Sequence, residues 1–328
     1  MKFFCIDSNH LYFAKNIAGH FQKEVLASRV ESFSDGEISC EIDNTVRGSD
    51  CFVVHSLYHD KDGLSINDRI MQLVFFIDAL KRASAKSINL VIPYIGYSRQ
   101  DRRNSKRQPI SSKVVAKLIS DKVDHIYTMD LHSDQIEGFF EIPVDNLSFK
   151  NIIFSEITKM KDTSNLMIVA PDMGSAHRVH SLAKTLKLPL SVIDKRRDKP
   201  NSISEMILIG DVKDKDVVLI DDLVDTGGTL RKAGDLLRHS GAKSIKVFAT
   251  HPILSGRAFD NLFLNESPFQ DIFFSNTVPI FCDLVHSKSG NSEMRKTNVS
   301  LHILDVSFCF SEAIEKTVLN QSVSSYIL

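Results

Sequence analysis

Short apolar runs alternate with longer amphipathic segments along most of the chain. Each run of four or five apolar residues predicts a buried strand, and each amphipathic segment predicts a helix that covers it. This alternation is typical of an α/β protein with a mostly parallel sheet flanked by helices. The predicted strands are residues 51–54, 88–92, 125–129, 166–169, 190–193, 217–220 and 245–248.

Two helices can be placed by the spacing of their apolar residues. One stripe runs from Leu230 to Leu237 and stops before Gly241, a residue type that commonly ends helices. The other follows Asn67, which we expect to be the N-cap. Its members are Ile70, Met71, Leu73, Val74, Ile77 and Leu80. Both stripes predict core packing rather than a functional surface.

The pattern changes between Pro143 and Phe149, where one series of alternations ends and another begins. We therefore expect two domains, residues 1–147 and 148–328. The length supports this division, because a domain usually has roughly 100–200 residues.

Composition narrows the class of protein. The 40 Lys and Arg nearly balance the 41 Asp and Glu, for a net charge of -1, so there is no basic excess to bind nucleic acid or an anionic membrane. No apolar run approaches the ~18 residues that a membrane span needs. The 5 cysteines are scattered, which argues against a disulfide framework. We expect a cytoplasmic protein with neither nucleic-acid nor membrane partners.

The most informative segment is residues 217–230, where a buried strand leads through Asp221 and Asp222 into a loop of small residues and then a helix. Backbone N–H groups at a helix start, with threonine hydroxyls beside them, suit a phosphate. Paired carboxylates suit vicinal hydroxyls. Together they describe a site for a pentose phosphate. An ordinary strand–turn–helix with solvated acids is the alternative, and the length of the matching string makes it the weaker one.

Other polar groups follow predicted strands, at the edge where open α/β sheets bind ligands. Arg99, Arg102, Arg103, Lys106 and Arg107 form a basic cluster that is either a solvated loop or a nucleotide-phosphate contact. A histidine or aspartate at a strand end, such as His132 or Asp172, is often only a structural hydrogen-bonding group or a helix cap. These residues alone leave those alternatives open.

The segment from Asp221 to Thr229 resembles the ribose-5-phosphate motif shared by phosphoribosyltransferases and the ribose-phosphate pyrophosphokinase (PRPP synthetase) family. Motifs at family-like spacing through nearly the whole chain favour the second. They lie at residues 33–37, 46–50, 78–85, 92–102, 129–132, 138–147, 193–197 and 322–324. The resemblance implies two tandem phosphoribosyltransferase-like domains, with ATP bound by the first and ribose 5-phosphate by the second. It also implies that the last ~20 residues pack back on the first domain.

The resemblance assigns a role to each matching residue. ATP would be bound by Asp35, Gly36, Glu37, Arg99, Gln100, Asp101 and His132. Ribose 5-phosphate would be bound by Arg197, Asp221, Asp222, Asp225, Thr226, Gly227, Gly228 and Thr229. Mg²⁺ would contact His132 and Asp172, and the catalytic cations of a flexible loop would be Lys195 and Arg197. Because Asp35 and Glu37 would reach the ATP of a neighbouring subunit, a homo-oligomer is expected, a hexamer by resemblance.

The implied reaction is transfer of the β,γ-diphosphoryl group of Mg-ATP to ribose 5-phosphate, giving PRPP and AMP. A non-catalytic regulatory relative or a phosphoribosyltransferase is the alternative. Three residues depart from the family pattern: Ser175 and Pro252 replace glycines, and His180 replaces an arginine. Ser175 would be strained if its φ had to be positive, and Pro252 removes a backbone donor. We expect these changes to affect turnover rather than the reaction.

Overall fold

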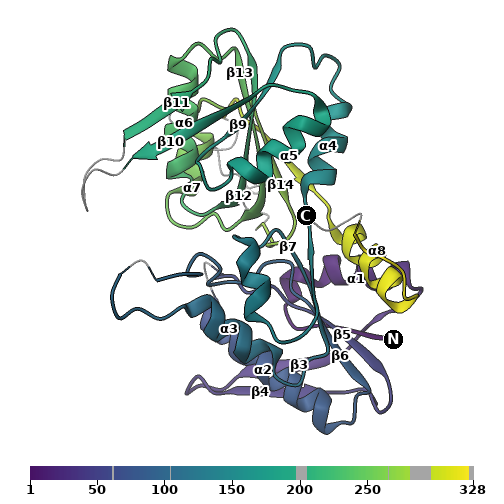
Figure 1. Ribbon diagram of the computed structural model, residues 1–328. Helices are drawn as coiled ribbons and strands as arrows, with labels where there is room; N and C mark the ends of the chain where they lie inside the picture. Colours follow the sequence, from purple (N-terminus) through teal and green to yellow (C-terminus); the bar gives the residue numbers. More distant parts are fainter. Residues whose placement is uncertain (61–62, 104, 197–204, 265, 281–296, 325–328) are drawn as a thin grey trace. The chain divides into compact units, whose positions relative to one another are not determined.

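The computed structural model describes residues 1–60, 63–103, 105–196, 205–264, 266–280 and 297–324. The chain forms two compact units (Figure 1). Unit 1 comprises Met1–Ser148, Asn276–Pro279 and Asp305–Leu328, and unit 2 comprises Phe149–Ser275 and Ile280–Leu304. Positions 276–279 and 305–328 therefore belong with the N-terminal half by contact, although they follow most of unit 2 in sequence.

Unit 1 is built on a six-stranded sheet in the order β2-β1-β5-β6-β7-β8, in which every neighbouring pair is parallel. A separate antiparallel hairpin is formed by β3 and β4. The strands are β1 (Lys2–Cys5), β2 (Val25–Leu26), β3 (Ser28–Ser32), β4 (Ile38–Ile42), β5 (Asp50–Val54), β6 (Ser87–Val91), β7 (His125–Met129) and β8 (Val144–Leu147).

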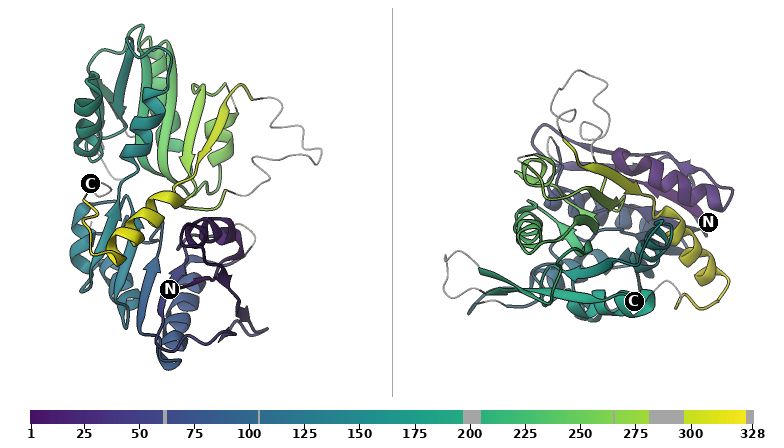
Figure 2. Two further views of the ribbon diagram at one scale, coloured as in Figure 1. Left: turned by 90° about the vertical axis from the view of Figure 1, so that its right-hand side faces the viewer. Right: turned by 90° about the horizontal axis from the view of Figure 1, so that it is seen from above.

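Helices cover both faces of this sheet (Figures 1 and 2). Side chains alternate between the faces of a strand, so Cys51 and Val53 of β5 join the core under α2 and α3. Phe52 points the other way and stacks on Phe3, on the side where Phe13 of α1 meets Phe310 of α8. The helical segments are η1 (Ser8–His10), α1 (Leu11–His20), α2 (Ile66–Arg82), α3 (Ser111–Ser120), η2 (Asp134–Phe139) and α8 (Ser307–Val318).

Unit 2 has a seven-stranded sheet in the order β11-β10-β9-β12-β13-β14-β15, parallel except for the β10–β11 pair. Its strands are β9 (Leu166–Ala170), β10 (Leu190–Arg196), β11 (Glu205–Ile209), β12 (Asp216–Val224), β13 (Ser244–Pro252), β14 (Asp271–Ser275) and β15 (Ser300–Leu304). Its helices are α4 (Lys150–Thr158), α5 (Ala176–Leu186), α6 (Gly228–His239) and α7 (Ala258–Phe263). The predicted α/β fold with mostly parallel sheets is confirmed.

All seven predicted strands are present, and both predicted helices form as α2 and α6. The expected N-cap of α2 was wrong by two residues. The cap is Ser65, whose hydroxyl accepts a hydrogen bond from Asp68 N at 3.2 Å while the Asp68 carboxylate accepts one from Ser65 N at 2.8 Å. This reciprocal pair is a capping box, which satisfies two donors that a single Asn67 cap could not. Met71, assigned to the core stripe, is exposed instead.

Among the helices that the structure describes, none is long and apolar enough to cross a lipid bilayer. The sheet cores instead bury their apolar residues against amphipathic helices, as a helix with one apolar face requires.

A buried charged cluster lies beyond β1 and β5 in unit 1. Arg69 of α2 is 1% exposed, and its Nη1 lies 2.8 Å from Asp7 Oδ2. Tyr58 donates a hydrogen bond to the same oxygen at 2.7 Å, and the Arg69 guanidinium carbon stands 3.9 Å from the centre of the Tyr58 ring. Burial opposes ionisation of Asp7, but the charge of Arg69 and the Tyr58 hydroxyl outweigh it and lower the Asp7 pKa.

Two histidines are buried beside this cluster. His55 Nε2 donates to the carbonyl oxygen of Arg69 at 3.1 Å, and His10 Nε2 donates to that of Asn276 at 3.4 Å. Burial lowers the pKa of His10 to about 4 and that of His55 to about 3, from an ordinary value of 6.5. The nearby Arg69 charge acts in the same direction on both. Both rings are therefore neutral in the native protein at neutral pH.

We predict that Asp7→Ala lowers the free energy of unfolding by about 3–5 kcal/mol, because it leaves the Arg69 charge buried without its partner. The measurement is urea denaturation at neutral pH. The control is Asp43→Ala, which breaks the exposed 2.9 Å pair with Arg29 and should cost less than about 1 kcal/mol. Equal effects of the two substitutions would contradict the structural role of the buried pair.

We also predict that acid weakens the fold before the carboxylates titrate. As the pH falls below 6.5 the unfolded chain takes up protons on His10 and His55, whereas the native protein stays neutral there until about pH 4 and about pH 3. Stability should therefore fall with pH by up to about 1.4 kcal/mol per pH unit for each histidine. Urea denaturation at pH 7 and pH 5 measures this slope, which His55→Gln should reduce; a flat profile would be inconsistent with it.

Candidate active site

Asp221 and Asp222 lie within β12, the central strand of the unit 2 sheet, rather than in the loop that follows it. Strand β12 continues through Val224, which pairs with Pro252 of β13. Asp222 N donates a hydrogen bond at 2.9 Å to Oδ1 of Asp221, which fixes the Asp221 carboxylate against the strand. The motif thus presents its carboxylates from a rigid strand instead of from the loop.

The surroundings of Asp221 disfavour the ionised form of its carboxyl group. Its pKa is raised well above the ordinary value, first by burial and then by the negative charges of Asp222 and Asp172. Asp172 comes close because β9 pairs with β12 in parallel, with Val169 opposite Leu219, so both strands end at the same edge. The Asp172 carboxylate is oriented by Ser175 N, which donates to Oδ1 at 2.8 Å.

Two cations approach this acidic group from neighbouring elements. Arg178 in the first turn of α5 places Nη1 3.9 Å from Asp222 Oδ2. Lys195 of β10, on the other side of β9, reaches across to Thr229, where Nζ lies 3.4 Å from Oγ1. The site therefore offers carboxylates for hydroxyls or a cation, and ammonium and guanidinium groups for an anion.

The loop between β12 and α6 has the geometry of an anion site. Gly227 is the N-cap of α6 with φ 71°, a left-handed conformation that side chains disfavour. A Cβ at this position would also lie 3.0 Å from Leu262 Cγ. The loop is fastened by Asn261, which donates to the Thr226 carbonyl at 2.8 Å, and by Ser255, which donates to Asp225. Gly228 and Thr229 then open the helix, and the N–H groups of a first helical turn point outward, away from the intrahelical ladder.

In unit 1 the predicted residues Arg99, Gln100 and Asp101 lie in the loop after β6. The turn is closed by Gln100 N, which donates to the Tyr97 carbonyl at 2.9 Å. Ser111 donates to Gln100 Oε1 at 2.7 Å and so fixes the side chain against the start of α3. Arg99 and Gln100 are exposed.

Asp101 connects this loop to the one after β7, which carries His132. Asp101 Oδ2 accepts hydrogen bonds from Ser133 at 2.7 Å and from Gln135 at 2.9 Å. Since Ser133 directly follows the exposed His132, the structure brings these two predicted positions to one edge of the sheet. Strands β6 and β7 are parallel neighbours, so the loops that follow them lie at the same edge of the sheet.

The remaining positions of the prediction lie elsewhere. Asp35, Gly36 and Glu37 form the exposed tip of the β3–β4 hairpin, where Gly36 has φ 92° and Glu37 N donates to Asp35 Oδ1 at 3.0 Å. His132 belongs to unit 1 and Asp172 to unit 2. Arg197 lies outside the described residues.

The departures from the family pattern can now be located. Ser175 has φ -81°, an ordinary right-handed conformation. Ser175 therefore does not carry the steric cost that a positive φ would impose. Its backbone N–H donates a hydrogen bond to the Asp172 carboxylate. His180 is exposed on α5. Pro252 is buried at the end of β13, where the following residue, Ile253, donates to the Val224 carbonyl at 2.9 Å.

Sequence reasoning assigned no role to several residues that organise the site. Arg178 was visible as a charge in a helix after the Asp172 loop, but its partner Asp222 lies 44 positions away in the printed sequence. Ser255 and Asn261, from the segment after β13, donate hydrogen bonds to the loop between β12 and α6. Only the sheet order brings these segments together, and a single sequence carries no direct signal for it.

No group of three or more His, Cys, Asp or Glu side chains within the described ranges has the geometry of a complete metal site. The crowding of Asp172, Asp221 and Asp222 nevertheless suits a divalent cation that keeps most of its water and binds few protein carboxylates. A cation would offset the repulsion that raises the Asp221 pKa. The three carboxylates do not form a metal site by themselves, so a cation beside them would take most of its ligands from water.

Because its surroundings disfavour the ionised Asp221 carboxylate, we can predict how its replacement changes the free energy of unfolding. Asp221→Asn should raise the free energy of unfolding by about 1 kcal/mol, since the amide oxygen can still accept from Asp222 N while the buried charge is lost. Asp271→Asn should instead lower it by about 1 kcal/mol. Although burial opposes ionisation there, hydrogen bonds from Lys246 and His302 lower the Asp271 pKa. Thermal unfolding of both variants measures whether the two substitutions change stability in opposite directions. A loss of stability in Asp221→Asn would contradict the prediction.

Known proteins with the same architecture identify the family. Residues 1–122 match the family model described as the N-terminal domain of ribose phosphate pyrophosphokinase, and residues 148–262 match the phosphoribosyl transferase domain. The ribose-phosphate pyrophosphokinase of Campylobacter jejuni is 39% identical over 322 residues, which cover 98% of this chain and 97% of the relative. That of Buchnera aphidicola is 46% identical over 270 residues, 81% of this chain and 83% of the relative.

A solved structure agrees with these relatives. The phosphoribosylpyrophosphate synthetase of Mycobacterium smegmatis superposes with a TM-score of 0.84 at 32% identity, covering 97% of this chain and 99% of the solved one. The resemblance read from the motifs is thereby confirmed. The chain belongs to the ribose-phosphate pyrophosphokinase family.

Proposed function

We propose that the chain is a catalytic ribose-phosphate pyrophosphokinase that forms PRPP and AMP from Mg-ATP and ribose 5-phosphate. The C1 hydroxyl oxygen attacks the β-phosphorus of ATP, and the bond between that phosphorus and the α,β-bridging oxygen breaks, so that AMP leaves. The observation that carries the proposal is the single edge of unit 2 that combines an anion-binding loop, paired carboxylates and Lys195.

Ribose 5-phosphate would bind along β12 and the loop that follows it. The residues from Asp225 to Thr229 receive the 5-phosphate, because a glycine-capped helix start presents backbone N–H groups and a hydroxyl to an anion. Asp221 and Asp222 accept hydrogen bonds from the ribose hydroxyls. Strand β12 supports this orientation, because it places the two acids immediately before the loop. The ribose ring would then contact the acids while its 5-phosphate reaches the loop.

Charge developing on the transferred group would be stabilised by Lys195, with Arg197 in the same role. Diphosphoryl transfer depends mainly on in-line positioning and on offsetting negative charge, so a cation already fixed beside the phosphate loop is a suitable catalyst. The contact of Lys195 with Thr229 supports this assignment. Arg178, whose Nη1 lies 3.9 Å from Asp222 Oδ2, would orient that carboxylate.

ATP would be bound by unit 1 through Arg99, Gln100, Asp101 and His132. The exposed guanidinium of Arg99 suits the phosphates, and the Asp101 bridge keeps the two loops in a fixed relation. Asp35, Gly36 and Glu37 would contact ATP of a neighbouring subunit from their exposed hairpin tip. This assignment makes the protein a homo-oligomer, with a hexamer taken from the resemblance.

Magnesium ions are the proposed cofactor, bound through His132 and Asp172 with Asp221 and Asp222 nearby. When bound, Mg²⁺ supplies positive charge that neutralises and aligns the triphosphate. The protein's own contribution is the orientation of Asp172 by Ser175 N. We further propose a cytoplasmic location, without nucleic-acid or membrane partners.

The two alternative functions make different demands on the site. A regulatory relative without activity would not need the positioned Lys195, whereas the described contact with Thr229 is retained. A phosphoribosyltransferase would need only the second family domain, but residues 1–122 match the N-terminal domain of ribose phosphate pyrophosphokinase. Neither alternative is favoured by the full-length relatives.

The test is AMP formation by the purified chain with Mg-ATP and ribose 5-phosphate in phosphate buffer. We expect AMP and the diphosphorylated sugar in equal amounts. Lys195→Ala should reduce kcat by roughly 100-fold or more, because it removes a charge that acts on the transferring group. Lys159→Ala, which alters an exposed lysine paired with Glu156, should leave kcat unchanged. Absence of AMP from the wild-type protein would refute the proposed reaction, and full activity in Lys195→Ala would refute only the role of that lysine.

A further inference from the structure

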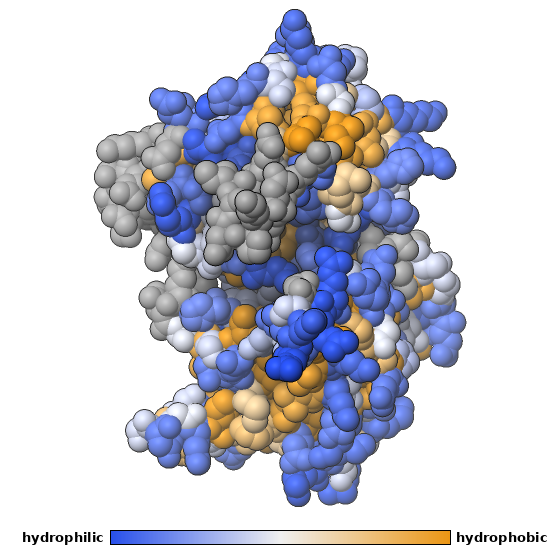
Figure 3. Space-filling model, turned by 60° about the vertical axis from the view of Figure 1, so that its left-hand side comes forward, coloured by the Kyte–Doolittle hydropathy of each residue, from blue (hydrophilic) through white to orange (hydrophobic). Residues whose placement is uncertain are grey.

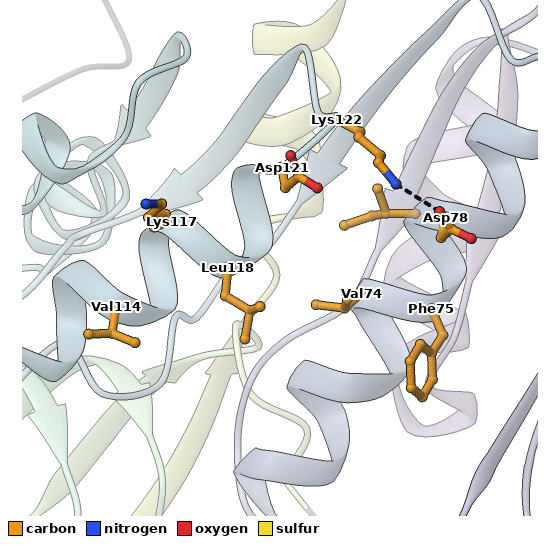
Figure 4. A pocket seen from close by; sticks show the side chains of 9 residues that line it. Val74, Phe75, Asp78, Val114, Lys117, Leu118, Asp121 and Lys122 are labelled. Carbon is orange, nitrogen blue, oxygen red and sulfur yellow. Dashed lines mark hydrogen bonds and ion pairs between the residues drawn. The ribbon is translucent and has the colours of Figure 1, made fainter.

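An apolar groove of about 640 Å³ lies between α2 and α3 of unit 1. Figure 4 shows Val114 and Leu118 opposite Val74 and Phe75, and in the space-filling view an apolar area lies on this part of unit 1 (Figure 3). None of the residues proposed to bind a substrate lines this groove. Polar contacts that the proposed function leaves without a role lie in unit 2 instead, between the segment after β13 and the loop after β12.

Three successive carbonyl groups, those of residues 224–226, accept hydrogen bonds from residues 253–261, which we call the β13–α7 segment. Backbone N–H groups of this segment donate to the first carbonyl at 2.9 and 3.1 Å and to the second at 3.1 Å. The third donor is the side chain of Asn261, whose Nδ2 lies 2.8 Å from the Thr226 carbonyl oxygen. All three carbonyl groups therefore point toward the β13–α7 segment.

The direction of these carbonyl groups fixes the direction of the N–H groups that follow them. In a trans peptide the C=O and the next N–H point in opposite directions. The N–H groups of Asp225, Thr226 and Gly227 therefore point away from the β13–α7 segment. Successive N–H groups that point to one side form a concave site for an anion. The Asp225 carboxylate, which would repel an anion, accepts a hydrogen bond from Ser255 of the same segment.

Packing of α7 keeps the loop in this orientation. A Cβ added to Gly227 would lie 3.0 Å from Leu262 Cγ and 3.4 Å from Asn261 Cβ, so α7 contacts this side of the loop directly. The segment that leads to α7 is strained at Leu254, whose φ is 53° although its side chain is buried. A left-handed leucine is unfavourable and persists only where the surrounding structure imposes it, which is common at ligand sites.

Asn261 differs from the backbone donors because its hydrogen bond can be removed by a substitution. It holds the peptide group between Thr226 and Gly227, whose N–H is the one that lies at the N-cap of α6. Glycine is compatible with several backbone orientations. Without the Asn261 bond, this peptide group is therefore free to rotate, and its N–H would no longer be directed at an anion in the loop.

We propose that Asn261 is a positioning residue for ribose 5-phosphate, because it holds the Thr226–Gly227 peptide with its N–H directed at the 5-phosphate. The inference rests on the proposed function, which assigns the 5-phosphate to this loop. Asn261 acts from the far side of the loop and does not contact the substrate. Its removal should therefore weaken the binding of the sugar phosphate without changing the transfer step.

The test compares two substitutions of this side chain. Asn261→Ala should raise the KM for ribose 5-phosphate by roughly 10-fold, since one hydrogen bond to a charged group is weakened. The kcat and the KM for Mg-ATP should not change, because Lys195 and unit 1 are untouched. Asn261→Leu keeps the volume of the side chain but has no donor, so it should raise the same KM as much as Asn261→Ala does.

A binding measurement separates this role from catalysis. Isothermal titration calorimetry with ribose 5-phosphate is carried out in the presence of Mg-α,β-methylene-ATP, which cannot release AMP. The Kd should rise by the same factor as the KM in both variants. The matched control is Asp260→Ala, the same substitution at the neighbouring residue of α7, whose carboxylate lies 3.8 Å from Arg257. This variant should keep the wild-type KM and Kd.

Circular dichroism and the thermal midpoint establish that every variant is folded. An unchanged KM in Asn261→Ala, a fall in kcat without a rise in KM, or wild-type affinity in Asn261→Leu would each overturn the positioning role. If the wild-type protein binds ribose 5-phosphate with a Kd that depends on Asn261 but forms no AMP, the proposed reaction fails and the positioning role stands. A wild-type protein that does not bind ribose 5-phosphate would overturn both.

Discussion

Parallel pairing of β9, β10 and β12 is the constraint on which the chemistry of unit 2 depends. Three strands in register end at one edge, and this brings Asp172, Lys195 and the Asp221–Asp222 pair together from segments that are distant in sequence. The arrangement also concentrates like charge, which adds to the effect of burial in raising the Asp221 pKa. Asp221 and Asp222 lie on a strand, so their backbone cannot move apart as it could on a loop.

The two units use buried charge in opposite ways. In unit 1, Asp7 is matched by Arg69 and Tyr58, and the cluster is almost closed to solvent. In unit 2, Asp221 is half-buried beside carboxylates that repel its charge. The first arrangement stabilises the fold, whereas the second stores unfavourable energy at the place where a cationic or hydroxyl-bearing ligand would relieve it. This difference separates structural from functional carboxylates more clearly than burial alone.

The fold could be predicted from the sequence because its strong signals are local, and the same kind of signal led to the proposed site positions. Apolar runs located the central strands, and the string from Asp221 to Thr229 located the anion loop. The prediction missed the β3–β4 hairpin and β15, whose residues are mostly exposed or only partly buried, and it also omitted the buried strands β1 and β14. Arg69 was missed because a charged residue in an amphipathic helix normally points to solvent. Contacts such as Ser133 with Asp101 depend on strand order, which hydrophobic periodicity does not encode.

Helix α8 packs on α1: His20 of α1 donates to Glu315 of α8 at 3.1 Å, and Asn16 of α1 donates at 2.9 Å to Asp305, just before α8. All of unit 2 lies between these partners in the chain. During synthesis, the residues of unit 2 therefore leave the ribosome before α8 can cover the α1 side of the unit 1 sheet. Unit 1 must remain open on that side, with Phe13 exposed, while unit 2 is completed. The first unit to be translated is thus the last to finish folding.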